Sequence, residues 1–174
     1  YNHSKRVADF SLALAKVLKL GKDGVNRLET CALLHDIGKI SISEEILNKP
    51  GGLTEEEWKI MKNHSKLGAD ITRNIPQLAS YADAILHHHE CYDGSGYPDG
   101  LKGENIPMEA RILAIADAFA TLTSERSYAE TLTHESALEE IKRCAGKQFD
   151  PYLVEQFISI YDKNISKTRR KARR

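Results

Sequence analysis

Histidines and aspartates recur along this chain at positions where a folded protein could bring them together. The most distinctive pair is His35-Asp36, which follows an apolar helical run and precedes Gly38 by one residue. Neutral imidazole and carboxylate are ligands that suit divalent transition metals. Taken alone, the same pair is typical of a helix end with a polar tip, so its interpretation depends on the other histidines.

Further candidate ligands lie on segments with a helical pattern. His64 falls within an apolar stripe, and His88-His89 end another; taken singly, each is more typical of a hydrogen-bonded core residue than of a ligand. Asp117 lies in a strongly apolar helix, where an unpaired carboxylate is costly to bury and a metal would offset the cost. The candidate set is therefore His3, His35, Asp36, His64, His88, His89 and Asp117.

Seven ligands are too many for one tetrahedral ion and suit two octahedral ions that share a carboxylate and a water. The lack of thiolates argues against structural zinc and the many imidazoles against calcium or magnesium, so iron or manganese fits best. Such a site favours an anionic substrate, and a hydroxide that bridges the ions could attack a phosphoryl group. Lys39 either neutralises further phosphate charge or is a surface lysine beyond the helix end.

Helices must position these ligands, and the sequence favours an all-α fold without strand-like alternation. Helical periodicity, caps and breakers predict about seven helices. The first of them has His3 in its first turn and ends at Gly21. The others are expected at Asp23 to Asp36, at Thr54 to Pro76, at Leu78 to His89, at Pro107 to Phe119, at Thr133 to Gly146 and from Pro151 onward, with one further helical turn at Glu44 to Leu47. A capping box, Thr54 with Glu57, starts the third helix and places Trp58 in its apolar stripe. The segment 90–107 is a long irregular loop, and such loops are usually functional.

At 174 residues and 29% charged residues, the chain is most simply one domain, expected over 1–162. The stretch 163–174 holds seven of the 25 lysines and arginines and no acid, which leaves residues 1–162 with a formal charge of −7. We expect this basic tail to be a frayed terminus, with binding to nucleic acid or a membrane surface as the alternative.

Three separated cysteines, Cys31, Cys91 and Cys144, form no Cys-x-x-Cys motif and indicate free thiols in the cytoplasm. No apolar run is long enough to cross a bilayer, and no signal peptide is recognisable. Because the chain begins at Tyr1 rather than at Met, we expect a fragment of a longer protein with an N-terminal sensory or regulatory part.

An ordered set of short motifs runs through the chain. These are His35-Asp36-Ile37-Gly38-Lys39, His88-His89-Glu90, Asp93-Gly94-Ser95-Gly96-Tyr97-Pro98, Ala110-Arg111-Ile112 and Ala116-Asp117, with His3-Ser4 near the start and Phe149-Asp150-Pro151 near the end. Up to about residue 160 the chain resembles the HD-GYP phosphodiesterases, a branch of the HD metal-dependent phosphohydrolases. The resemblance implies a helical bundle around two or three metal ions, usually iron or manganese. The implied activity is hydrolysis of cyclic di-GMP, a bacterial second messenger, to pGpG and in some members to GMP.

The resemblance also implies roles for residues of this sequence. The metal ligands would be the seven residues of the candidate set. Asp36 and Lys39 would serve the catalytic chemistry, and substrate contacts would come from Lys39, Tyr97, Arg111 and Arg126. A homodimer or a regulatory domain of the same chain would be the partner, and no DNA binding is expected.

The chain departs from the family pattern at three places. A glutamate found in members with three metals would lie upstream of Tyr1, Ala120 stands where an aspartate is usual, and Ala129 replaces a basic residue. Two alternatives therefore stay open. The domain could be a cyclic-dinucleotide-binding or protein-interaction module with weak or no turnover, or a phosphodiesterase for another cyclic dinucleotide.

Overall fold

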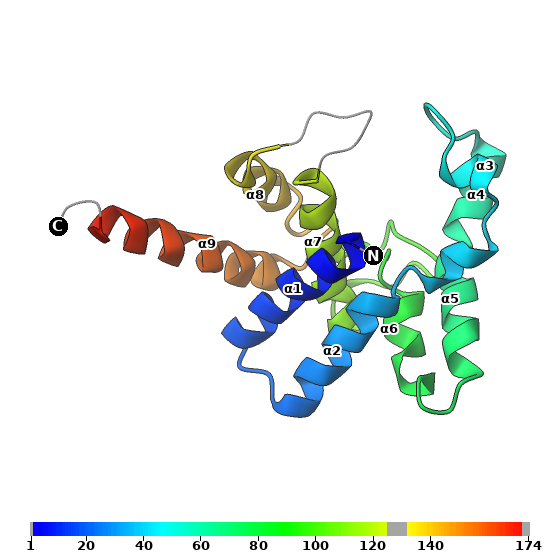
Figure 1. Ribbon diagram of the computed structural model, residues 1–174, viewed down its shortest axis with the longest axis horizontal. Coiled ribbons are helices and arrows are strands. Elements are labelled where there is room, and N and C mark those ends of the chain that lie inside the picture. Colours follow the sequence, from blue (N-terminus) through cyan, green and yellow to red (C-terminus); the bar gives the residue numbers. More distant parts are fainter. Residues whose placement is uncertain (1, 125–131, 172–174) are drawn as a thin grey trace.

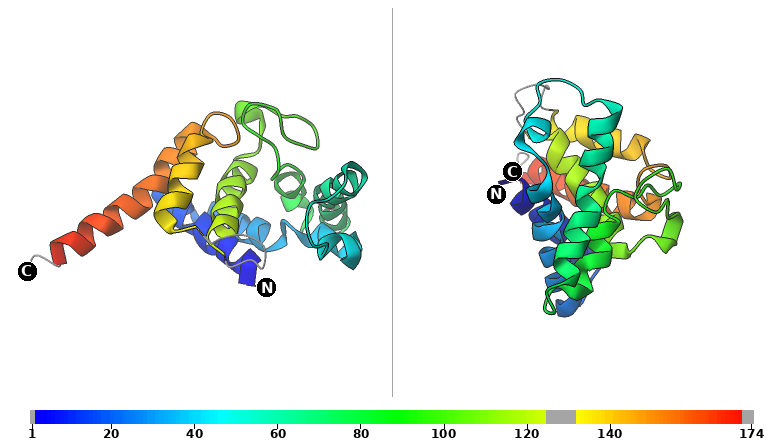
Figure 2. Two further views of the ribbon diagram at one scale, coloured as in Figure 1. Left: turned by 90° about the horizontal axis from the view of Figure 1, so that it is seen from above. Right: turned by 90° about the vertical axis from the view of Figure 1, so that its right-hand side faces the viewer.

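The computed structural model is an all-helical domain (Figures 1 and 2). It describes the backbone of residues 2–124 and 132–171 and the side chains of residues 3–124 and 132–161. The α-helices are α1 (Asn2–Val17), α2 (Lys22–Leu34), α3 (Glu44–Leu47), α4 (Glu55–Lys62), α5 (His64–Arg73), α6 (Ala82–Leu86), α7 (Met108–Leu122), α8 (His134–Arg143) and α9 (Pro151–Lys171). Short 3-10 turns lie at Ile37–Ser41, Ala79–Tyr81 and Gly103–Asn105. Within these ranges no strand occurs, and the prediction of an all-α fold is confirmed.

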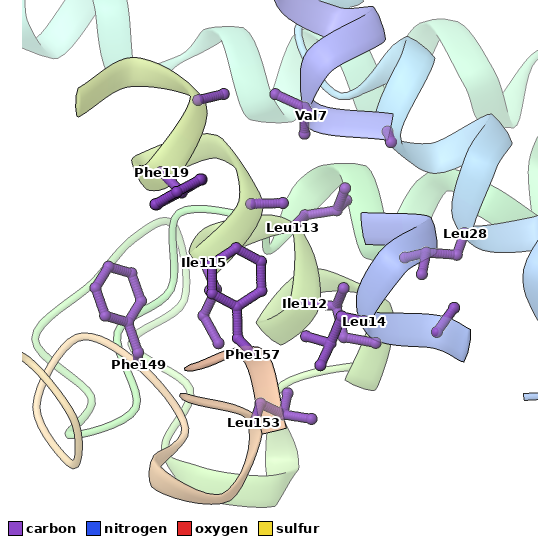
Figure 3. Close-up of a cluster of buried hydrophobic side chains, with 14 of the residues drawn as sticks. Val7, Leu14, Leu28, Ile112, Leu113, Ile115, Phe119, Phe149, Leu153 and Phe157 are labelled. Carbon is purple, nitrogen blue, oxygen red and sulfur yellow. The ribbon is translucent and has the colours of Figure 1, made fainter. Parts of the chain in front are cut away.

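Helix α7 is the centre of the bundle because its sequence is apolar on nearly all sides. Ile112, Leu113, Ile115 and Phe119 are fully buried, and α1, α8, α6, α2 and α9 all pack against this helix. A helix that is apolar all round needs such cover. Figure 3 shows the side chains that meet it from α1, α2 and α9, which include Val7, Leu14, Leu28, Leu153 and Phe157. Asp117 is thus carried on the most rigidly packed helix of the domain.

The helix expected after Thr54 is two helices, α4 and α5, which meet at Asn63. The capping box is present as predicted: Thr54 Oγ1 accepts the Glu57 N–H at 3.3 Å, and Glu57 Oε2 accepts the Thr54 N–H at 2.7 Å. However, α4 buries none of its residues, and Trp58 exposes 48% of its surface. The predicted apolar stripe is buried at His64 and Gly68 in α5 but exposed at Trp58, because α4 extends past the bundle, as Figure 1 shows.

Two helices end earlier than predicted, which matters for the site. Helix α2 ends at Leu34 rather than Asp36, and α6 at Leu86 rather than His89. In both cases a histidine ring just beyond the helix hydrogen-bonds to a carbonyl of its last turn, in place of a backbone N–H. The candidate ligands His35, Asp36, His88 and His89 therefore lie in turns directly after helices.

The C-terminal helix α9 continues to Lys171, so the backbone of the predicted basic tail is helical over much of its length. In Figure 1 this helix reaches away from the bundle. The domain boundary at residue 162 stays a prediction. None of the described helices is both long and apolar enough to cross a membrane.

Candidate metal centre

The seven candidate ligands converge from five segments of the chain. They come from α1, the turn after α2, the first residue of α5, the turn after α6 and the middle of α7. They form two groups, and within each group all ligand atoms lie within 4.8 Å of one another. One group is Asp36, His64, His88 and His89; the other is His3, His35 and Asp117. The structure thus brings together every residue for which metal ligation was expected.

The turn that carries His35 and Asp36 packs directly on the start of α5, and Gly38 makes this contact possible. A Cβ atom on Gly38 would lie 1.9 Å from the carbonyl oxygen of His64 and 2.5 Å from the backbone nitrogen of Gly68. Only glycine allows the two backbones to approach so closely. The glycine of the His-Asp motif therefore sets the position of Asp36 relative to His64.

Backbone hydrogen bonds fix the orientation of three histidine rings. The Nδ1–H groups of His35, His64 and His88 donate to the carbonyl oxygens three residues earlier, at 2.7, 2.7 and 2.6 Å. A carbonyl oxygen only accepts, so Nδ1 carries the proton in each ring. Burial, opposed only in part by these bonds and by Asp36, lowers the pKa of His64 and His88, so both rings are neutral near pH 7. Their Nε2 atoms then present free lone pairs, as metal-binding histidines do.

The Nε2 atoms of His64 and His88 face each other with no proton between them, whereas Nε2 of His89, 3.1 Å from that of His64, can donate to it when it carries the proton. Nε2 of His64 lies 3.4 Å from Nε2 of His88, and Oδ1 of Asp36 lies 3.5 Å from the same His64 atom. Nε2 of His35 is buried without a hydrogen-bond partner and lies 3.4 Å from Oδ2 of Asp36. Facing lone pairs repel, and a cation would turn each of them into a ligand. Because Asp36 has one oxygen near each group, it is the residue placed to bridge them.

The two aspartates are both ionised, for different reasons. Burial opposes the charge of Asp36, but the Lys39 ammonium, whose Nζ donates to Oδ2 at 2.6 Å, holds the pKa of this carboxyl well below the usual range. Burial also opposes the charge of Asp117, and a 2.9 Å hydrogen bond with Nε2 of His3 lowers its pKa. Since His3 offers a partner to Asp117, burial of that carboxylate does not by itself require a metal. The facing Nε2 atoms make the case for a cation.

The Gly-Tyr-Pro loop covers one side of this cluster. The ring of Tyr97 stacks on that of His89, with centroids 5.0 Å apart and planes inclined by 26°. Glu90, only 3% exposed, accepts the backbone N–H of Asp99 through Oε1 at 2.8 Å and so ties the loop to the turn that holds the histidines. No role was predicted for Glu90, and the signal for one was a carboxylate placed directly after two candidate ligands, His88 and His89.

A groove of about 990 Å³ opens beside the first group of ligands. His64 and His89 lie in its wall together with Lys39, Tyr97 and residues of α4. This volume is at the upper end of the range for small-molecule sites, roughly 300–1,000 Å³. Lys39 and Tyr97, two of the residues expected to contact substrate, therefore both line this groove.

Arg111, a third expected substrate contact, does not line this groove. Arg111 donates to Oδ2 of Asp150 at 2.7 Å and to the carbonyl oxygen of Ile106 at 3.0 Å, and it is absent from the groove wall. These bonds give Arg111 a structural role, in tying α7 to the start of α9. Arg126 and Ala129 lie outside the described residues.

Acid should destabilise the metal-free protein, because burial lowers the pKa of His64, His88 and His89, the last to about 3, below the ordinary value of 6.5. Below pH 6.5 the unfolded chain binds protons that the native protein does not, so stability falls with decreasing pH. At pH 5 the loss should reach about 2 kcal/mol for each strongly shifted ring. The pKa values of the two aspartates are lowered from 3.8, so their contribution is lost only at still lower pH.

Urea unfolding in the presence of a chelator checks this expectation. The unfolding midpoint should be clearly lower at pH 5 than at pH 7.5. An equal or higher midpoint at pH 5 would show that these rings are already charged in the native state.

Together, these features define an all-α domain with a largely buried cluster of His and Asp residues that could hold metal ions, and a groove beside it. Residues 1–153 match the family model described as HD domain, and the chain belongs to this family, whose members bind divalent metals. The recognition that the motifs suggested is confirmed.

Known relatives agree with this assignment. The chain is 42% identical over 156 residues to the cyclic di-GMP phosphodiesterase response regulator RpfG of Xanthomonas campestris, covering 88% of this chain and 41% of that protein. It is 39% identical over 168 residues to 3'3'-cGAMP-specific phosphodiesterase 2 of Vibrio cholerae, covering 94% and 32%. The crystal structure of a cyclic GMP-AMP phosphodiesterase of V. cholerae, V-cGAP3, superposes with a TM-score of 0.70 at 25% identity, covering 92% of this chain and 44% of that one. The chain spans less than half the length of these proteins.

Proposed function

We propose that this domain is a metal-dependent phosphodiesterase that hydrolyses cyclic di-GMP to pGpG and, in a second step, to GMP. The observation that carries the proposal is the cluster of imidazole nitrogens around Asp36, in which those of His64 and His88 face each other without a proton, beside a groove whose wall holds His64 and three lysines. The relative named as a cyclic di-GMP phosphodiesterase supports the choice of substrate. Free thiols at Cys31, Cys91 and Cys144 are consistent with a cytoplasmic setting, which we include in the proposal.

Each group of ligands would hold one ion, with Asp36 shared between them. The donor set of imidazoles and carboxylates fits iron or manganese best. When bound, paired ions would supply Lewis-acid stabilisation of the reacting phosphate oxygens. The turns after α2 and α6 would hold the ligands in place through the Nδ1–H bonds of His35 and His88, without adjustment during the reaction.

Lys39 is the residue best placed to contact the reacting phosphate. Its ammonium group is held 2.6 Å from Oδ2 of Asp36, while 40% of the side chain stays exposed in the groove. Held in this way, a fixed positive charge beside the ligands stabilises negative charge that develops on a phosphate. Lys39 would therefore act in catalysis as an electrostatic partner rather than as a proton donor.

A second candidate substrate is 3'3'-cGAMP, because one of the reported relatives is named for that specificity. Protein reconstituted with Mn²⁺ or, without oxygen, with Fe²⁺ should be tested against cyclic di-GMP, 3'3'-cGAMP and cyclic di-AMP. We expect cyclic di-GMP to give the highest kcat/KM. A higher value for 3'3'-cGAMP would replace the proposed substrate, and tight binding without any turnover would identify a binding module instead.

Replacing Tyr97 with alanine should raise KM for the dinucleotide by roughly 10-fold, since loss of a stacking partner costs about 1–3 kcal/mol. The ring forms part of the groove wall and supports His89 by stacking. Tyr97→Phe keeps the ring and should keep most of the affinity, which makes it the matched control. Metal content, measured alongside KM, should stay unchanged in both variants. Loss of metal from Tyr97→Ala would mean that the ring holds the centre together rather than the substrate.

A further inference from the structure

Helix α4 presents an aromatic side chain to the same groove that reaches the metal ligands. Trp58 lies in the groove wall with His64 and His89, yet 48% of its surface is exposed. It is the only tryptophan in the chain. Since α4 buries none of its residues, Trp58 is not there to complete the core.

Lysines flank Trp58 on the same wall. Lys59 and Lys62 line the groove together with Lys39, against a single carboxylate, that of Glu55. Nζ of Lys62 lies 5.3 Å from the centroid of the Tyr97 ring, so this lysine lies beside the Gly-Tyr-Pro loop. The wall on α4 is therefore cationic as well as aromatic, a combination that suits a nucleotide.

Local interactions hold α4 in shape without help from the core. Its first turn is closed by the capping box of Thr54 and Glu57. Lys49, in the connection from α3, donates to both carboxylate oxygens of Glu57 at 2.6 and 2.8 Å. The main packing partner of α4 is α5, which begins with the ligand His64. The aromatic wall is thus linked directly to the helix that carries a candidate metal ligand.

We propose that α4 binds the half of the dinucleotide that does not react, an inference that rests on the proposed function. Trp58 stacks on a purine base, and Lys59 and Lys62 contact the phosphate that is not at the metal centre. Because both a metal ligand and Trp58 line one groove, a ligand with one phosphate at His64 can extend to α4. Stacking is tolerant of base identity, so this wall should accept guanine and adenine alike.

The single tryptophan gives a direct test by fluorescence. The Mn²⁺-reconstituted protein is titrated with a non-hydrolysable phosphorothioate of cyclic di-GMP while Trp58 is excited selectively. Saturable quenching is expected. Because the Trp58 variants lack the fluorophore, their affinities are measured by isothermal titration calorimetry with the same ligand. Trp58→Phe should keep most of the affinity, whereas Trp58→Ala should lose about 5- to 150-fold, the equivalent of 1–3 kcal/mol of stacking. Tyr152→Ala, an exposed aromatic of α9 outside the groove, serves as the matched control and should bind as wild type does.

The contribution of the Lys59 and Lys62 charges to dinucleotide binding is tested with neutral replacements. Lys59→Gln and Lys62→Gln should each weaken binding, and the loss should shrink as salt is added, because an exposed charge pair is screened. Lys16→Gln, on the last turn of α1, should have no effect.

A second substrate separates this inference from the proposed function. Bis(p-nitrophenyl) phosphate has a phosphodiester but no purine, so Trp58→Ala should lower kcat/KM for cyclic di-GMP far more than for this compound. Equal losses, or unchanged fluorescence in a protein that does hydrolyse cyclic di-GMP, would overturn the role of α4 alone. Saturable quenching without turnover would uphold the role of α4 and overturn the proposed function. A protein that neither binds nor hydrolyses the dinucleotide would overturn both.

Discussion

Asp36→Ala should lose bound metal and all measurable phosphodiesterase activity. One carboxylate oxygen of Asp36 lies 3.4 Å from His35 and the other 3.5 Å from His64, so its removal takes a ligand from both groups. Loss of a residue that only supports a ligand already costs about 10–100-fold in metal affinity, and a shared ligand should cost more. Removing one partner of a buried charge cluster should also lower the free energy of unfolding of the metal-loaded protein by about 3–5 kcal/mol.

Two further variants make this result interpretable. Asp36→Asn keeps the size of the side chain without its charge, and it should lose metal and activity as well. Asp83→Ala removes an aspartate whose side chain is 72% exposed and paired only with the surface residue Arg73, so stability should change little. Metal analysis and turnover are measured on all three proteins. A folded, metal-loaded and active Asp36→Ala protein would refute the assignment of the centre.

Gly38→Ala should destabilise the fold and disturb the metal centre at the same time. The added methyl group would lie 1.9 Å from the backbone oxygen of His64, where no flexible side chain can yield. Overpacking of this kind costs about 1–3 kcal/mol, and the upper part of that range applies because backbone must move. The turn of Asp36 and the start of α5 would separate, which should weaken metal binding as well. Thermal unfolding and metal affinity are the measurements.

Gly24→Ala is the matched control for this substitution. Gly24 lies in the first turn of α2, and a Cβ atom there would come no closer than 3.5 Å to any neighbour. Alanine favours helix over glycine by about 0.5–1 kcal/mol, so this variant should be neutral or more stable. Equal behaviour of Gly38→Ala and Gly24→Ala would mean that the close contact between Gly38 and α5 does not exist in solution.

The sequence predicted which side chains the fold brings together, because each of them breaks an otherwise regular pattern. His64 and Asp117 stand out as polar residues on apolar helices, and both lie in the cluster. The two groups of ligands, and the position of Asp36 between them, could not be predicted, because they depend on how α5 packs against the turn after α2. The Nδ1 hydrogen bonds that orient the rings are likewise a product of the folded backbone.

Several further features depend on the three-dimensional context of each residue, which the sequence does not show. Trp58 fits an amphipathic pattern, but the pattern does not reveal that α4 extends past the bundle into the groove wall. Arg111 matches a family motif, yet Asp150, far away in the sequence, binds its guanidinium group. Ala120, where an aspartate is usual, is fully buried in the apolar core. Ala129 lies outside the described residues, and a gain in affinity from Ala129→Lys stays a prediction.

The central claim is that two divalent ions, held by the two ligand groups, make this domain a cyclic dinucleotide phosphodiesterase. Its most direct test is turnover of cyclic di-GMP by metal-free protein as Mn²⁺ is added in known ratio to the chain. We predict that activity rises as two ions bind per chain and disappears again when they are removed by a chelator. Full activity with no ion bound, or with one ion per chain and no gain from a second, would contradict the two-ion centre around Asp36.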